Sequence, residues 1–157
     1  MAEGFSHLDD EGHVRMVDVG SKEPTARHAV AEASVLMSEE TRDRLFSGDL
    51  PKGDAMATVR LAAIQGAKRT PDLVPLAHPL VIDAISAEIE ATDTGARITV
   101  SVSVTAKTGV EMEAITGAAI GAIALYDMIK GIDRAAEIAS VRLLEKWGGK
   151  SGGWRRD

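Results

Sequence analysis

The chain has no cysteine, which excludes disulfide bonds and thiolate-ligated metal sites. Aromatic residues make up only 3% of it, so few side chains are available to stack on nucleic-acid bases. Basic residues are also outnumbered, with 18 Lys and Arg against 24 Asp and Glu, a formal net charge of −6. Sequence-independent binding of DNA or RNA depends on Lys and Arg, so we expect no nucleic-acid partner. The acidic N-terminus has no apolar run of the secretory kind, and we expect a cytoplasmic protein.

Hydrophobic residues form 45% of the 157 residues, enough for the core of one globular domain spanning residues 1–157. The two ends differ from the rest. Residues 1–13 are polar and acidic and are expected to form a mobile arm, and the glycine-rich, basic residues 147–157 are expected to form a flexible tail. The arm contains four residues that could ligate a metal, His7, Asp9, Asp10 and His13; a disordered acidic terminus is the alternative.

The stretch at residues 107–130 has an uncharged centre, residues 114–126, made mostly of Ala, Gly and Ile. This composition predicts a helix that is buried on nearly every side. The uncharged run is shorter than the roughly 20 apolar residues of a membrane span, and no membrane association is expected. Gly117 and Gly121 lie four residues apart, so one helix face has almost no side chains and allows another element to approach closely.

Alternation of apolar and polar residues predicts strands at residues 14–19 and 29–37, and a hairpin of strands at 81–92 and 96–107. Ser38 is a candidate N-cap of a helix that ends near Phe46, and Asp54 caps a second helix. Three prolines in residues 70–80 predict a stiff extended connection. Residues 138–144 fit either a strand or a helix. The element order is ββααββαβ, an α+β fold.

Two residues outside the long helix are candidates for chemistry. Lys52 comes just before a predicted helix N-terminus, where free N–H groups attract anions such as phosphate; a solvated surface lysine is the alternative. His78 precedes Pro79 in a rigid loop, a common place for a catalytic histidine, although many loop histidines have no such role.

Five fragments together resemble one family, cyclic pyranopterin monophosphate synthase, the C protein of molybdenum cofactor biosynthesis. In order, they are HLDDEGHVRMVDVGSKEPTAR, LPKGDAMATVRLAAIQGAK, LVPLAHPL, KTGVEMEAITGAAIGAIALYDMIK and VRLLEKWGGKSG. The resemblance runs from about His7 to Gly152. It departs from the family at Ala77, where a cysteine is usual, and at Trp147, where a small residue is usual.

The resemblance implies a ferredoxin-like fold, with dimers that assemble into hexamers. It also implies a lyase that converts 3′,8-cyclo-7,8-dihydroguanosine triphosphate to cyclic pyranopterin monophosphate and pyrophosphate, with no metal and no organic cofactor. Asp127 is then the catalytic acid or base, and Lys52 and Lys130 are catalytic cations, either of which could also move protons. The implied substrate-binding residues are Lys22, Arg27, Leu76, Ala77, His78, Glu111, Met112, Glu113 and Lys146. Two alternative functions remain, a non-catalytic pterin or purine-nucleotide binding protein on this fold and a structural oligomer with no ligand. For Asp127 and Lys130 the alternative is a simple surface ion pair.

The spacing along the long helix bears on how such a site is assembled. Glu113 and Asp127 are fourteen residues apart, about 21 Å along a helix, too far for one compact reacting centre to touch both. A two-fold dimer brings one end of the helix to the opposite end of its partner's helix. We therefore expect a site shared between chains, with Asp127 and Lys130 from one chain and Lys52, His78 and Glu113 from the other.

Overall fold

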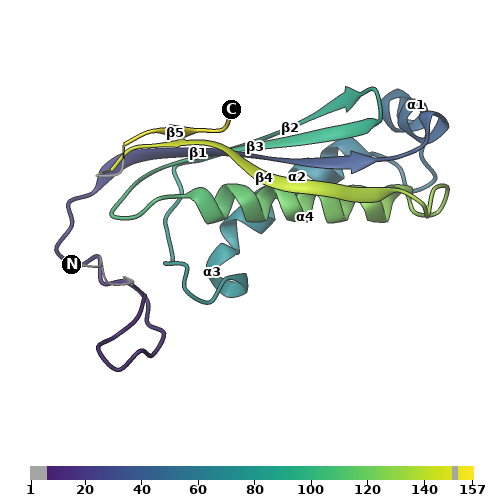
Figure 1. The fold of residues 1–157 in the computed structure, drawn as a ribbon. Helices are drawn as coiled ribbons and strands as arrows, with labels where there is room; N and C mark the ends of the chain where they lie inside the picture. Colours follow the sequence, from purple (N-terminus) through teal and green to yellow (C-terminus); the bar gives the residue numbers. More distant parts are fainter. Residues whose placement is uncertain (1–6, 150–151) are drawn as a thin grey trace.

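The computed structural model describes residues 7–149 and 152–157. Its strands form a single sheet in the order β2-β3-β1-β4-β5, in which every neighbouring pair is antiparallel (Figure 1). In chain order the elements are β1 (Thr25–Leu36), α1 (Glu39–Ser47), α2 (Ala55–Lys68), α3 (Thr70–Leu73), β2 (Ala84–Thr92), β3 (Gly95–Ala106), α4 (Glu111–Ile129), β4 (Glu137–Trp147) and β5 (Trp154–Arg155).

Helices α2 and α4 cover one face of this sheet, and α4 runs along the strands for most of their length (Figure 1). The covered face of β1 presents small side chains, with Ala29, Ala31 and Ala33 fully buried. Larger side chains of β3, such as Ile98 and Val100, stand beside them in register. The strand order with one helical layer is that of the ferredoxin-like fold, as the family resemblance implied, and the α+β class predicted from the residue patterns is confirmed.

The glycines of α4 permit the close approach that the sequence analysis expected. A side chain at Gly117 would lie 3.0 Å from the Ala63 carbonyl oxygen of α2 and 3.0 Å from a methyl group of Val100 in β3. One at Gly121 would lie 3.3 Å from both Ala63 and Ile98. Helix α4 is long and apolar enough to span a membrane by those two criteria alone. Its burial between α2 and the sheet identifies it as the core helix of this fold.

The strand predicted at residues 14–19 is wrong. Apart from a single bridge between Leu8 and Val14, this segment makes no strand pairing in the described part of the chain. The alternation has another cause: Val17 and Val19 are half-buried, whereas the residues between and beside them are exposed. Both valines line a cavity beside the start of α4, so their alternate burial arises without a sheet.

Other boundaries also differ from the sequence-based expectation. Residues 70–80 are not wholly extended, because Thr70–Leu73 form α3, whose Pro71 sits in the first turn where no N–H donor is needed. Strand β1 begins at Thr25, before residue 29, and β2 begins at Ala84, after residue 81. Residues 138–144 belong to strand β4. In the predicted flexible tail, Trp154–Arg155 pair with β4 as β5.

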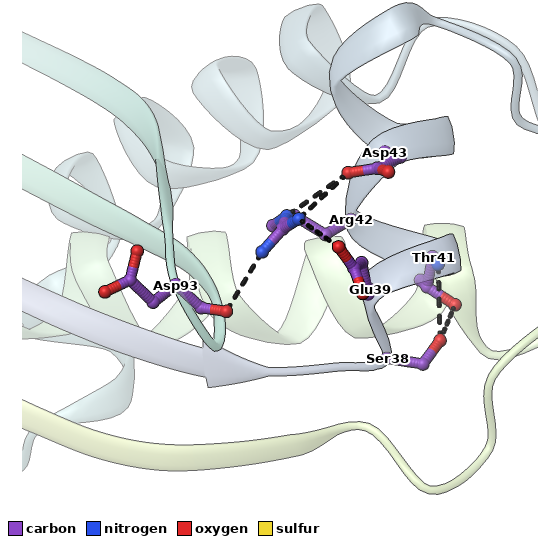
Figure 2. A network of polar contacts seen from close by, with 6 residues as sticks. All are labelled: Ser38, Glu39, Thr41, Arg42, Asp43 and Asp93. Carbon is purple, nitrogen blue, oxygen red and sulfur yellow. Dashed lines mark hydrogen bonds and ion pairs between the residues drawn. The ribbon is translucent and has the colours of Figure 1, made fainter.

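Helix α1 is fixed at the end of the sheet by the polar contacts that Figure 2 shows. The Ser38 hydroxyl accepts a hydrogen bond from the Thr41 N–H at 3.2 Å, and Gly48 ends the helix in the left-handed conformation. Arg42 donates to the Asp93 carbonyl oxygen at 2.9 Å and so joins α1 to the β2–β3 turn. Both predicted N-caps, Ser38 here and Asp54 at α2, are confirmed.

Asp133 is expected to stabilise the fold in a pH-dependent way. Its carboxylate accepts from the Ser38 N–H at 2.9 Å, and this bond is the main cause that lowers the pKa of Asp133. A carboxyl group whose pKa is lowered on folding stabilises the folded state at pH values above its unfolded pKa of about 3.9. This stabilisation is lost as the pH falls through the pKa of the folded state. We expect Asp133→Asn to lower Tm by roughly 2–4 °C at pH 7. In thermal melts the difference from the wild type should narrow as the pH falls below about 4 and vanish once the pH is below the lowered pKa of Asp133. A constant difference across this range would contradict the assignment.

Candidate active site

The residues that the sequence singled out gather at the two ends of α4. Asp127 follows Glu111 by sixteen residues, so the two ends are about 24 Å apart along the helix axis. In Figure 1 the N-terminal segment and α3 lie where α4 begins, and α1 lies near its other end. We call the group at the C-terminal end, Lys52, Asp127 and Lys130, the lysine–aspartate cluster. The cavity at the N-terminal end is called the arm pocket.

In the lysine–aspartate cluster, two ammonium groups hold one carboxylate. Lys52 Nζ lies 2.8 Å from one carboxylate oxygen of Asp127, and Lys130 Nζ lies 2.9 Å from the other. Lys52 also donates to the Asp127 main-chain carbonyl at 2.7 Å. About half of each of these side chains remains exposed, so the charges face solvent and are accessible to a ligand.

The sequence places Lys52 there through the turn that precedes α2. Gly53 has a φ of 88°, a conformation that glycine adopts without strain, and the chain turns sharply at this residue. The next residue, Asp54, caps α2 by accepting from the Ala57 N–H at 3.0 Å. Lys52 is thereby held at the start of α2 and reaches across to the last turn of α4.

The electrostatics of this cluster determine which groups are charged. The hydrogen bond from Lys52 and then that from Lys130 lower the pKa of Asp127 to about 2. The same pairing with Asp127 raises the pKa of Lys130. At neutral pH, therefore, Asp127 is a carboxylate and Lys130 an ammonium. In this state Asp127 can accept a proton but has none to donate, and the cluster carries a net positive charge suited to an anion.

The arm pocket is a cavity of about 570 Å³ lined by the N-terminal segment, the loop after α3 and the start of α4. Two of the lining residues, Lys146 of β4 and Glu111 of α4, form an ion pair of 2.9 Å. His78 Nε2 lies 2.8 Å from the Val17 carbonyl oxygen; a carbonyl only accepts, so this nitrogen carries the hydrogen. The full lining is His7, Val17, Val19, Lys22, Leu76, His78, Thr108, Gly109, Glu111, Met112 and Lys146.

Two further cations stand beside the arm pocket. Lys22 lines both this cavity and a neighbouring one of about 520 Å³, which Arg27 also lines. The Arg27 guanidinium donates to the carbonyl oxygens of Ala106 and Lys107 at 3.0 and 3.1 Å. These bonds hold Arg27 at the end of β3, next to the loop that leads into α4.

The consecutive residues Met112 and Glu113 differ sharply in exposure. Met112 is 40% exposed and lines the arm pocket, whereas Glu113 is only 3% exposed. Burial raises the pKa of the Glu113 carboxyl group because charge is disfavoured away from water. In a single chain Glu113 is therefore buried on the first turn of α4 and does not line the arm pocket. Ala77 lies in the loop between the pocket residues Leu76 and His78.

Metal-binding groups do not gather within residues 7–149 and 152–157, where no set of three or more His, Asp or Glu side chains could hold an ion. Two of the four candidates in the arm contact each other: His13 lies 3.5 Å from Asp9, and it also lies 3.5 Å from Glu11.

The structure corrects one sequence-based grouping and adds residues that the sequence analysis missed. Lys52 had been grouped with His78 and Glu113, but it lies with Asp127 and Lys130 at the other end of α4. The missed pocket residues include Thr108 and Gly109, whose signal was their position within the fourth family fragment, as the first two residues of TGVEMEA. Val17 and Val19 were missed because their alternation was interpreted as a strand.

The structure defines a ferredoxin-like α+β protein with charged side chains gathered at both ends of its core helix. The chain belongs to the MoaC family, whose family model matches residues 16–149. Two similar proteins are named cyclic pyranopterin monophosphate synthase. The one from Roseiflexus sp. (strain RS-1) is 48% identical over 98% of both chains. The one from Brucella ovis is 47% identical over 98% of this chain and 94% of its own. The family resemblance seen in the sequence is confirmed.

The lysine–aspartate cluster is expected to serve chemistry and not stability. Lys52→Ala and Asp127→Asn should each reduce turnover at least about a hundredfold, the usual contribution of acid–base groups. Tm should stay within about 2 °C of the wild type, because exposed ion pairs stabilise little. A matched control is Asp49→Asn, which breaks the 3.4 Å pair between Arg44 of α1 and Asp49 just beyond the end of that helix. Steady-state kinetics measure the loss of turnover, and thermal melts measure the change in Tm. A large loss of Tm with retained turnover would instead make Lys52 a residue that caps the C-terminal end of α4.

Proposed function

We propose that this protein is a cyclic pyranopterin monophosphate synthase. It is a lyase that converts 3′,8-cyclo-7,8-dihydroguanosine triphosphate to cyclic pyranopterin monophosphate and releases pyrophosphate. Family membership supports this reaction, and so does the identity of 47–48% to relatives that carry this name. A cytoplasmic location, expected from the sequence, is part of the proposal.

The observation that carries the proposal is the carboxylate of Asp127 held between Lys52 and Lys130. Forming a cyclic phosphate requires pyrophosphate to leave, and fixed cations stabilise the negative charge that develops on it. Rearranging the purine-derived ring requires proton transfers. A carboxylate and an ammonium group that contact each other can serve as the base and the acid. When substrate phosphates attract the two lysines, the main cause that lowers the pKa of Asp127 weakens. Asp127 then becomes a stronger base as the substrate binds.

The arm pocket is assigned to substrate recognition. Met112 and Leu76 offer an apolar surface for the guanine-derived ring, with Ala77 in the loop beside Leu76, and Glu111 offers a carboxylate to the N–H edge of the ring. Glu113 is buried and does not line the cavity, so this proposal gives it no direct contact with the ring. Lys22, Arg27 and Lys146 supply positive charge for the triphosphate, and His78 adds a polar contact. No metal or organic cofactor enters this proposal.

One chain holds these two groups too far apart for a single substrate. They are separated by about 24 Å along α4, so the lysine–aspartate cluster of one chain must meet the arm pocket of another. A two-fold dimer creates two such composite sites. We propose this arrangement, with Lys52, Asp127 and Lys130 from one chain and the pocket residues from its partner, within a hexamer built as a trimer of dimers.

Conversion of the substrate is the direct test of the proposed reaction. Purified protein incubated with the cyclic dihydroguanosine triphosphate should release pyrophosphate and yield a pterin that becomes fluorescent on oxidation. Both products should be absent with Asp127→Asn. Binding of the substrate without either product would instead indicate a non-catalytic pterin or nucleotide carrier.

Subunit complementation tests the composite site. Asp127→Asn and His78→Ala lie at opposite ends of α4, so a mixed dimer has one site with both defects and one wild-type site. Two inactive variants should recover about a quarter of wild-type activity when mixed equally under conditions that exchange subunits, because half of the dimers are mixed and half of their sites are intact. The control is Lys52→Ala with Asp127→Asn, which share one cluster and should recover nothing. Recovery in the control but not in the test pair would refute this division.

A further inference from the structure

The segment of residues 17–22 lies along the arm pocket as a strap that no strand pairing secures. Val17, Val19 and Lys22 line the cavity, and Asp18 and Gly20 between them are exposed. Within the described residues the segment belongs to no helix or strand, so its position depends on other contacts. Two side chains from the body of the protein supply them, His78 and Lys107.

Lys107 holds the strap at its turn. Its ammonium group donates to the Gly20 carbonyl oxygen at 2.6 Å, a short, charge-assisted hydrogen bond. The turn itself is well defined, because the Asp18 carboxylate accepts from the Gly20 N–H at 2.7 Å and the Lys22 N–H donates to the Val19 carbonyl at 3.1 Å. Fixing Gly20 therefore also fixes Lys22, two residues further on.

The Lys107 contact and the His78 contact differ in whether a ligand in the cavity can compete for them. His78 binds the Val17 carbonyl, but it also lines the cavity, so a ligand can compete for it. Lys107 precedes the cavity-lining residues Thr108 and Gly109 and does not itself line the cavity. Its main-chain carbonyl accepts from Arg27, which ties the base of Lys107 to β1. Lys107 is thus anchored to the fold at one end and to the strap at the other.

We propose that Lys107 is a positioning residue that holds the strap, and with it Lys22, over the substrate in the arm pocket. This inference rests on the proposed function, because Lys22 is assigned there to the triphosphate. Lys107 acts through the strap and does not touch the substrate. Removing it should release the strap and weaken substrate binding, whereas the chemistry at the lysine–aspartate cluster should continue.

The test compares Lys107→Met with Lys107→Arg, which keeps a cationic donor, and with Lys68→Met, which removes an exposed lysine on α2. Trypsin cleavage after Lys22 reports the strap and needs no activity. We expect cleavage about tenfold faster in Lys107→Met, near the wild-type rate in Lys107→Arg, and unchanged in Lys68→Met. KM and the calorimetric Kd for the cyclic dihydroguanosine triphosphate should rise about tenfold in Lys107→Met, with kcat within about twofold of the wild type.

Weaker binding with unchanged cleavage would make Lys107 a direct ligand, and faster cleavage with unchanged binding would make the strap irrelevant to the site; either result overturns the proposal. If Lys107→Met fails to fold, Asp18→Ala loosens the same turn from the exposed side and should give the same two changes. If the wild type neither binds nor converts the substrate, the proposed function fails. The cleavage rates alone then decide whether Lys107 anchors the strap.

Discussion

The close contact of α4 with α2 and the sheet is the constraint on which the other features depend. A Cβ atom added at Gly117 or Gly121 would lie only 3.0–3.3 Å from atoms of the neighbouring elements, namely those of Ala63, Val100 and Ile98. Glycine costs roughly 1 kcal/mol of helix propensity against alanine at each position, which close packing must offset. The charged residues of α4 stand only at its two ends, because the uncharged run of residues 114–126 lies between them. In the proposed function the chemistry is therefore confined to those ends.

This confinement links the fold to the proposed assembly. A buried helix of nineteen residues separates the lysine–aspartate cluster from the arm pocket by more than one reacting centre can span. The helix is too rigid to bring its own ends together. A second copy in the opposite orientation joins unlike ends without any change in the chain, so oligomerisation in this proposal is a requirement of catalysis.

The two ends also differ electrostatically in a way that suits separate tasks. At the C-terminal end, two lysines lower the pKa of Asp127 to about 2 and keep it charged and exposed. At the N-terminal end, burial raises the pKa of Glu113, and Lys146 pairs with Glu111 beside it. One carboxyl group is stabilised as an anion in water, whereas the other is shielded from it.

The sequence by itself determined the elements whose causes are local. The caps at Ser38 and Asp54, the β2–β3 hairpin and the buried helix all follow from residues close together in the chain. Fragment order also identified the family and most of the candidate site. Tertiary structure decided what depends on distant neighbours. Residues 14–19 alternate like a strand, but find a pocket instead of a strand partner, and residues 138–144 become β4 because β1 offers them an edge. Lys52 joins Asp127, seventy-five residues away, because the turn at Gly53 aims it at the end of α4. No local sequence pattern predicts this ion pair, because it depends on how α2 and α4 pack against each other.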